Sequence, residues 1–151
     1  LGSGNTAGSW RERITQDGLI VRVADHEVLA SGLAMPHSPR LVGSRLYFLA
    51  SALGHLNYLD LSTGAVHTVA ELGRFAKLQG AGQGSEAGLM GVDLSTGQIQ
   101  FNAVFADGID EVYDVQCRPG GSVGMMGTSD QAKYDLITVQ GGAFWQQREA
   151  N

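Results

Sequence analysis

The chain has one cysteine, Cys117, so it cannot form an intrachain disulfide bond, and we expect a reducing, cytoplasmic environment. It has no apolar run that approaches the ~20 residues a membrane-spanning helix needs. Cations are also few, since 10 Lys and Arg are outnumbered by 15 Asp and Glu, for a net charge of −5. Because nucleic acids and anionic membranes bind clustered cations, the sequence argues against both as partners.

A sustained helical period is missing as well, and residues 10–14 could form one helical turn at most. Glycine, in contrast, is abundant, with 22 residues, which is about twice the usual frequency. These glycines follow no collagen period and alternate with segments rich in Val, Leu, Ile and Tyr. They predict turns between strands, and hence an all-β fold.

The strongest pattern in the chain is an internal repeat. The pentapeptide Asp-Leu-Ser-Thr-Gly occurs at residues 60–64 and again at residues 93–97, each time between two apolar runs. Its last residue is the glycine that a tight hairpin with a left-handed position requires, and Asp and Ser can accept bonds from nearby backbone amides. Two weaker copies have the same shape. In residues 19–30 the predicted turn is Asp25-His26, and in residues 134–145 it is Gly141-Gly142.

A second pair of strands is predicted before two of these hairpins. Residues 38–42 and 45–50 flank Gly43-Ser44, and residues 112–117 and 122–126 flank a Pro-Gly-Gly segment. Four strands that recur every ~35–45 residues are typical of β-propeller blades. We predict three four-stranded antiparallel units at residues 31–70, 71–105 and 110–148, with residues 18–30 adding outer strands. Before its hairpin, the glycine-rich middle unit is expected to have one short strand near residues 76–79 and then a loop. This unit can therefore have three strands in total.

The segment SGLAMPHSPRL, residues 31–41, is similar to a family of uncharacterised bacterial proteins with β-propeller-like repeats. The resemblance extends through GSRLYFLASALGHLNYLDLSTGAVHTVAEL, LMGVDLSTGQI and DEVYDVQCRPG. Family members are longer, and the chain is similar to their C-terminal half. The resemblance implies half of a propeller and implies no activity.

Half of a propeller would expose apolar blade faces, which soluble monomers rarely tolerate. Two copies related by a two-fold axis would close a ring of about six blades. We therefore expect a homodimer. The alternative is a β-sandwich or barrel that closes on itself.

The innermost strand of each blade faces the central channel of a propeller, so candidate ligand-binding residues lie there. The predicted innermost strands are residues 35–41, 75–79 and 111–117. Their polar candidates are His37, Ser38, Arg40, Lys77, Glu111, Tyr113 and Asp114.

The sequence leaves three functions open. The first is a binding or scaffold module for a small molecule or protein. The second is a hydrolase or lyase in which His37 acts with Glu111 or Asp114 at the channel. The third is a recombined fragment that has lost its site. No metal or cofactor is expected, because the four histidines lack ligand spacing and the glycine segments match no nucleotide-binding motif.

Overall fold

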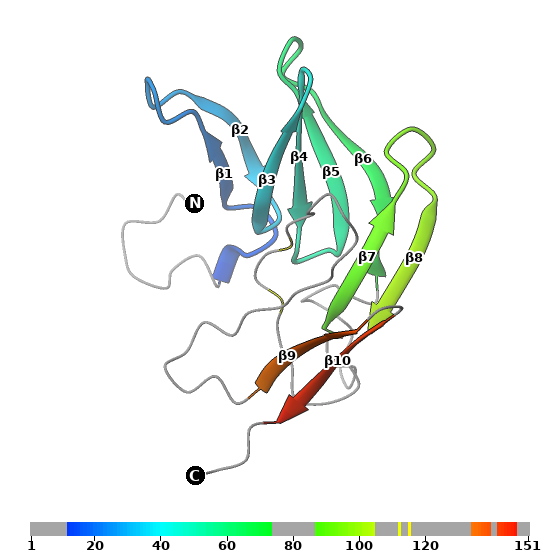
Figure 1. The fold of residues 1–151 in the computed structure, drawn as a ribbon. Coiled ribbons are helices and arrows are strands. Elements are labelled where there is room, and N and C mark those ends of the chain that lie inside the picture. The colour runs from blue at the N-terminus through cyan, green and yellow to red at the C-terminus, as the bar shows by residue number, and fades with distance from the viewer. Residues whose placement is uncertain are drawn as a thin grey trace. The chain divides into compact units, whose positions relative to one another are not determined.

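A computed structural model describes residues 12–73, 87–104, 112 and 115, and the backbone of residues 134–139 and 142–147. Every strand in this part of the chain pairs antiparallel, so the all-β prediction is confirmed. None of its helices is long and apolar enough to cross a membrane. The chain divides into two units, Leu1–Val115 and Gln116–Asn151, which are described separately. The strands (Figure 1) are β1 (Gly18–Val21), β2 (Val28–Leu33), β3 (Pro36–Val42), β4 (Arg45–Ala50), β5 (His55–Asp60), β6 (Val66–Glu71), β7 (Gly88–Val92), β8 (Ile99–Val104), β9 (Tyr134–Val139) and β10 (Gly142–Gln147).

A four-stranded sheet in the order β3-β4-β5-β6 forms the centre of the first unit. Figure 1 shows these strands side by side in chain order. A two-residue turn joins β3 to β4, and Gly43 adopts a φ of 60° in it, as the first position of a type II′ turn requires. The strands that the sequence predicts within residues 38–42, 45–50 and 56–69 are all present in this sheet. We call it the central sheet.

Three hairpins in the first unit end in equivalent turns. In the β5–β6 turn Gly64 N donates to Asp60 O (2.8 Å), and in the β7–β8 turn Gly97 N donates to Asp93 O (2.8 Å). Both glycines are left-handed, with φ of 74° and 73°. The β1–β2 turn has the same bond from His26 N to Arg22 O (2.9 Å), and His26 takes the glycine position with a φ of 61°. The first hairpin therefore has the same turn geometry as the other two, with a different sequence.

The second unit contains a hairpin of β9 and β10. Gly142 pairs with Val139 as the first residue of β10, so it belongs to the strand and not to the turn that the sequence predicts. The strands predicted at residues 76–79 and 122–126 lie outside the described residues. Of the strand predicted at residues 112–117, Val112 and Val115 are described, and neither belongs to a strand.

The hydrophobic core lies between one face of the central sheet and the β1–β2 hairpin. Phe48 of β4 and Leu59 of β5 are fully buried and form a cluster with Leu33 of β2. Ile20, Leu29, Ala30 and Leu46 pack around this cluster. The hairpin approaches the sheet closely at Gly18, where a Cβ atom would overlap the Pro36 ring and the Leu33 carbonyl oxygen. We call this side of the sheet its apolar face.

Candidate functional site

Three of the candidate residues predicted from the sequence, His37, Ser38 and Arg40, lie together in β3. This strand is an edge of the central sheet, and the side chains of His37 and Arg40 are exposed. The other four candidates, Lys77, Glu111, Tyr113 and Asp114, lie outside the described residues. The site is therefore built from β3 and from the strands beside it.

A β-bulge interrupts β3 between His37 and Arg40. His37 pairs with Leu49, and Arg40 pairs with Tyr47, so three steps along β3 span two steps along β4. Residues three apart on a regular strand point to opposite faces of the sheet. The bulge absorbs one residue and turns His37 and Arg40 to the same face.

This arrangement strains the backbone within the MPHSPR segment. Met35 and Ser38 are left-handed, with φ of 53° and 51°. A left-handed conformation costs roughly 1–2 kcal/mol for a residue with a Cβ atom, because the Cβ approaches the following carbonyl oxygen. A backbone hydrogen bond from Ser51 N to Met35 O (3.1 Å) stabilises the strained segment. Backbone strain of this kind is concentrated at functional sites, where the surrounding structure maintains it.

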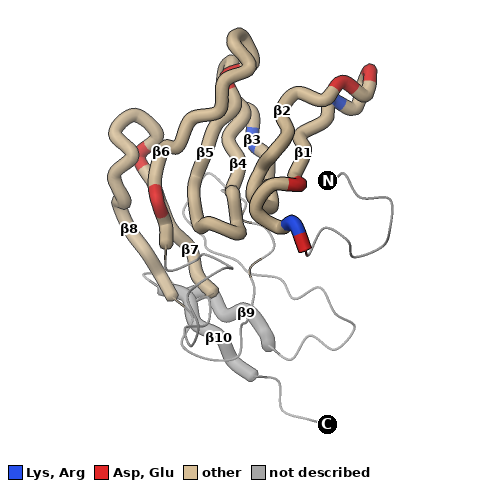
Figure 2. The backbone as a smooth tube through the Cα atoms, turned by 180° about the vertical axis from the view of Figure 1, so that it is seen from behind, with Lys and Arg blue, Asp and Glu red and all other residues tan. Residues whose placement is uncertain are grey.

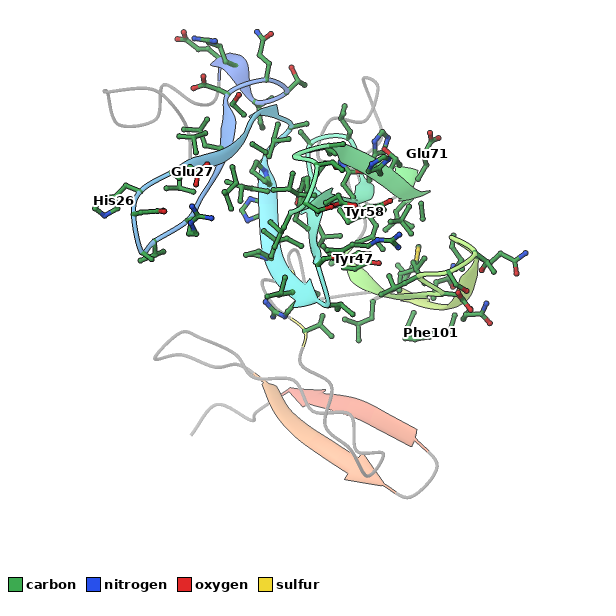
Figure 3. All side chains as sticks on the ribbon, turned by 90° about the horizontal axis from the view of Figure 1, so that it is seen from above. His26, Glu27, Tyr47, Tyr58, Glu71 and Phe101 are labelled. Atoms are coloured by element: carbon green, nitrogen blue, oxygen red, sulfur yellow. The ribbon has the colours of Figure 1, made fainter. Side chains whose placement is uncertain are left out.

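The face that His37 and Arg40 share carries a row of aromatic rings. Arg40, Tyr47, Tyr58 and His67 pair in register across β3, β4, β5 and β6. The centroids of the Tyr47 and Tyr58 rings are 5.6 Å apart, and those of Tyr58 and His67 are 4.9 Å apart in a stacked arrangement. Figure 3 shows Tyr47 and Tyr58 next to each other on the sheet. We call this side of the central sheet its aromatic face.

Arg45, at the start of β4, adds a second guanidinium to the aromatic face. Its Cζ atom lies 4.6 Å from the centroid of the Tyr58 ring, a cation–π distance. The hydrogen bond to Tyr47 and the charge interaction with Tyr58 raise the pKa of Arg45 above its ordinary value. Arg45 pairs across the strands with Asp60, whose pKa is lowered chiefly by hydrogen bonds from Ser62. One end of the row, at β3 and β4, thus carries the two guanidinium groups, and the other end, at β6, is the imidazole of His67.

A family described as Domain of unknown function (DUF4915) matches residues 1–80. The chain belongs to the DUF4915 family. The match includes β1 to β6, and therefore the MPHSPR segment and the whole aromatic face. The resemblance to an uncharacterised family is confirmed at this level, while propeller repeats and a bacterial source stay predictions. No curated protein and no solved structure matched the chain.

Arg45, Tyr58 and His67 of this DUF4915 chain are not predicted as site residues by its sequence. A signal for two of them was present. Asp60 N donates to Ala65 O and closes the turn, Tyr58 lies two residues before Asp60, and His67 lies two residues after Ala65, so the hairpin pairs Tyr58 with His67 directly. In the described ranges 12–73 and 87–104, no group of three or more His, Cys, Asp or Glu residues is arranged to hold a metal ion.

Proposed function

We propose that this chain is a propeller-type binding module that assembles as a homo-oligomer and presents its ligand-binding residues from β3. The observation that carries the proposal is the bulge in β3. A left-handed Ser38 is unfavourable in isolation, yet it turns His37 and Arg40 to one face of an exposed edge strand.

Two features of the fold support the propeller architecture. The central sheet is a four-stranded antiparallel meander, which is the arrangement of a propeller blade. The three equivalent hairpin turns support a repeat of blade-like units along the chain. In such an architecture β3, the first strand of its sheet, is the innermost strand and borders the central channel.

Exposed apolar side chains at both ends of the first unit support assembly with a second copy. Phe101 and Ile99 of β8 are 57% and 49% exposed, and Val23 and Val28 of the first hairpin are 86% and 52% exposed. Blade faces pack against one another through such residues, and large exposed apolar patches are rare on monomers. A second copy is the partner proposed, because a repeated blade offers the same kind of face at each end.

An enzymatic function is the alternative, with His37 acting beside Glu111 or Asp114. The two carboxylates lie outside the described residues, so this function stays a prediction from the sequence. The same holds for an inactive fragment of a longer propeller.

The test of the binding function is a thermal-shift screen of carboxylates, phosphates, sugars and amines on the full chain. The screen is repeated on a His37→Ala/Arg40→Ala variant and on a His26→Ala/Arg22→Ala control. The control removes the same residue types from the exposed β1–β2 turn. Ligands that raise the melting temperature of the wild type and the control, but not of the β3 variant, support the proposal. Ligands that act equally on all three proteins, or a screen without a ligand, would overturn it.

A further inference from the structure

The three hairpins with equivalent turns can be aligned residue by residue. The backbone carbonyls of Arg22, Asp60 and Asp93 each accept a bond from the N–H four residues on. Their N–H groups each donate to the carbonyl oxygen five residues on. The ladder pairs beside the turns are therefore equivalent, namely Val21 with Val28, Leu59 with Val66 and Val92 with Ile99.

One contact between successive sheets lies within the first unit, where the β1–β2 hairpin covers the apolar face of the central sheet. Ile20 and its ladder partner Ala30 pack on the core that contains Leu59. Because Ile20 and Val21 are neighbours on β1, they point to opposite faces of the hairpin. One face of this hairpin thus packs on the following sheet, and the other face carries Val21 and Val28.

The β7–β8 hairpin has the face that packs on a following sheet. In the alignment of the turns, Gly91 is the equivalent of Ile20, and its ladder partner Phe101 is the equivalent of Ala30. Ala30 packs on a core, whereas Phe101, a larger apolar residue at the same position, is exposed. We call this side of the β7–β8 hairpin its packing face.

The β1–β2 hairpin has the complementary face. Val21 is the equivalent of Leu59, which is fully buried where the first hairpin packs on the central sheet. Val28, the ladder partner of Val21, is exposed. We call this side of the β1–β2 hairpin its receiving face. The first unit therefore has an exposed packing position in its last hairpin and an exposed receiving position in its first.

The strands of these two faces are uncharged. Figure 2 shows β1, β2, β7 and β8 without acidic or basic residues. The charged residues of the first hairpin lie at its turn, where Arg22 forms ion pairs with Asp25 and Glu27. Contact between the two faces would therefore bury apolar surface without removing a charge from water.

We propose that two copies of this chain assemble through a heterologous contact, in which the packing face of one copy, at Phe101, covers the receiving face of the other, at Val21 and Val28. The contact repeats the one that the β1–β2 hairpin makes with the central sheet within one chain. Two such contacts, related by a two-fold axis, close a ring. This assignment rests on the proposed homo-oligomer and adds the surfaces that meet in it.

The test is light scattering of full-chain variants, alone and mixed, at a concentration at which the wild type is dimeric. Val28→Lys and Phe101→Asp should each raise the dissociation constant of the dimer by at least about 100-fold, because each buries a charge in both contacts. An equimolar mixture of the two variants should regain the dimer mass. A mixed pair keeps one contact unchanged, and the introduced lysine faces the introduced aspartate in the other.

Val66→Lys, the equivalent substitution on β6, is the matched control and should keep the mass of the wild type. Circular dichroism shows whether each variant is folded. If Phe101→Asp is unfolded, Ala103→Asp on the same face of β8 takes its place, because Ala103 lies two residues further along the strand.

A dimeric Val28→Lys variant, or a mixture that stays monomeric, would overturn the heterologous contact. A Phe101→Asp variant that melts at a lower temperature but stays dimeric would overturn it too, since the packing face would then be covered within one chain. In these cases the wild type is still a dimer, and the proposed assembly stands. A wild type that is monomeric at every concentration would overturn both the contact and the assembly, while the thermal-shift screen would still decide on ligand binding at β3.

Discussion

Among the described residues, three other than glycine adopt left-handed backbone conformations, and they do so for different reasons. Met35 and Ser38 lie around the bulge of β3, where the conformation sets the direction of site residues. His26 lies at the tip of the β1–β2 hairpin, where Figure 3 labels it. Its equivalents in the other two turns are Gly64 and Gly97, so the left-handed φ at His26 is required by the turn itself and not by the histidine side chain.

His26→Gly is therefore expected to stabilise the protein. Glycine adopts a φ of 61° without the Cβ clash, although it also gains entropy in the unfolded chain, so the expected net gain is about 0.5–1 kcal/mol. Urea unfolding followed by circular dichroism measures it. Gly64→Ala, which introduces a Cβ atom at the equivalent position, should lower stability by about 1 kcal/mol. A loss of stability in His26→Gly would mean that the imidazole makes a favourable interaction in the turn.

Asn57 is a polar residue in the apolar face of the central sheet. It pairs with Phe48 and Thr68, it is 8% exposed, and its Oδ1 accepts no hydrogen bond from the described residues. A buried acceptor without a partner costs about 1–3 kcal/mol. Asn57→Val, which is apolar, only slightly larger than Asn and suited to a strand, should thus raise the free energy of unfolding by about 1 kcal/mol. Chemical denaturation measures the change, and a destabilised Asn57→Val variant would show that the amide is satisfied in solution.

The Asp-Leu-Ser-Thr-Gly turns illustrate how a short sequence determines an element. Asp60 Oδ1 accepts from Ser62 N (2.9 Å) and Ser62 Oγ (2.5 Å), and Asp93 Oδ1 accepts from Ser95 N (2.8 Å) and Ser95 Oγ (2.6 Å). These bonds favour the ionised carboxylates, and the pKa of each lies below the ordinary value of 3.8. The pentapeptide thus determines the turn through one carboxylate, one hydroxyl and one glycine.

The same hydrogen bonds make the free energy of unfolding depend on pH in the acidic range. Because the pKa of Asp60 and of Asp93 is lower in the folded chain than in the unfolded chain, their contribution is complete above the unfolded value near 3.8. It is lost as the pH falls through the lower folded values. An Asp60→Asn/Asp93→Asn variant should therefore lose less stability than the wild type between pH 5 and pH 2. Thermal unfolding across that range measures both, and identical slopes would contradict the assigned hydrogen bonds.

The sequence predicted the hairpins well because their turns are local. Asp-Leu-Ser-Thr-Gly and Gly43-Ser44 specify their turns by residue type, and alternation specifies the strands beside them. The sequence could not predict the bulge, because serine has no preference for a left-handed φ and only pairing with β4 imposes it at Ser38. It selected His37 and Arg40 but could not place them on one face. It missed Arg45, whose position over Tyr58 depends on the register of β4 and β5.

At the level of the whole molecule, the proposed assembly accounts for apolar residues that the described part of the chain leaves exposed. The first unit buries one face of the central sheet against the β1–β2 hairpin. Phe101 lies over Gly91 on the paired strand, where a Cβ atom would overlap its ring, and still exposes 57% of its surface. Burying a Phe side chain is worth about 1.5–3 kcal/mol, so contact with a second copy at β8 would contribute substantially to association.

The most direct test of the proposed assembly is the mass of the full chain in solution, measured by light scattering on a sizing column across a dilution series. Two half-rings that close one propeller predict twice the mass of the chain, maintained on dilution to low concentration. Phe101→Asp should shift the protein toward the monomer mass while the circular dichroism spectrum stays the same. A folded wild-type chain with the monomer mass at every concentration would contradict ring closure by a second copy.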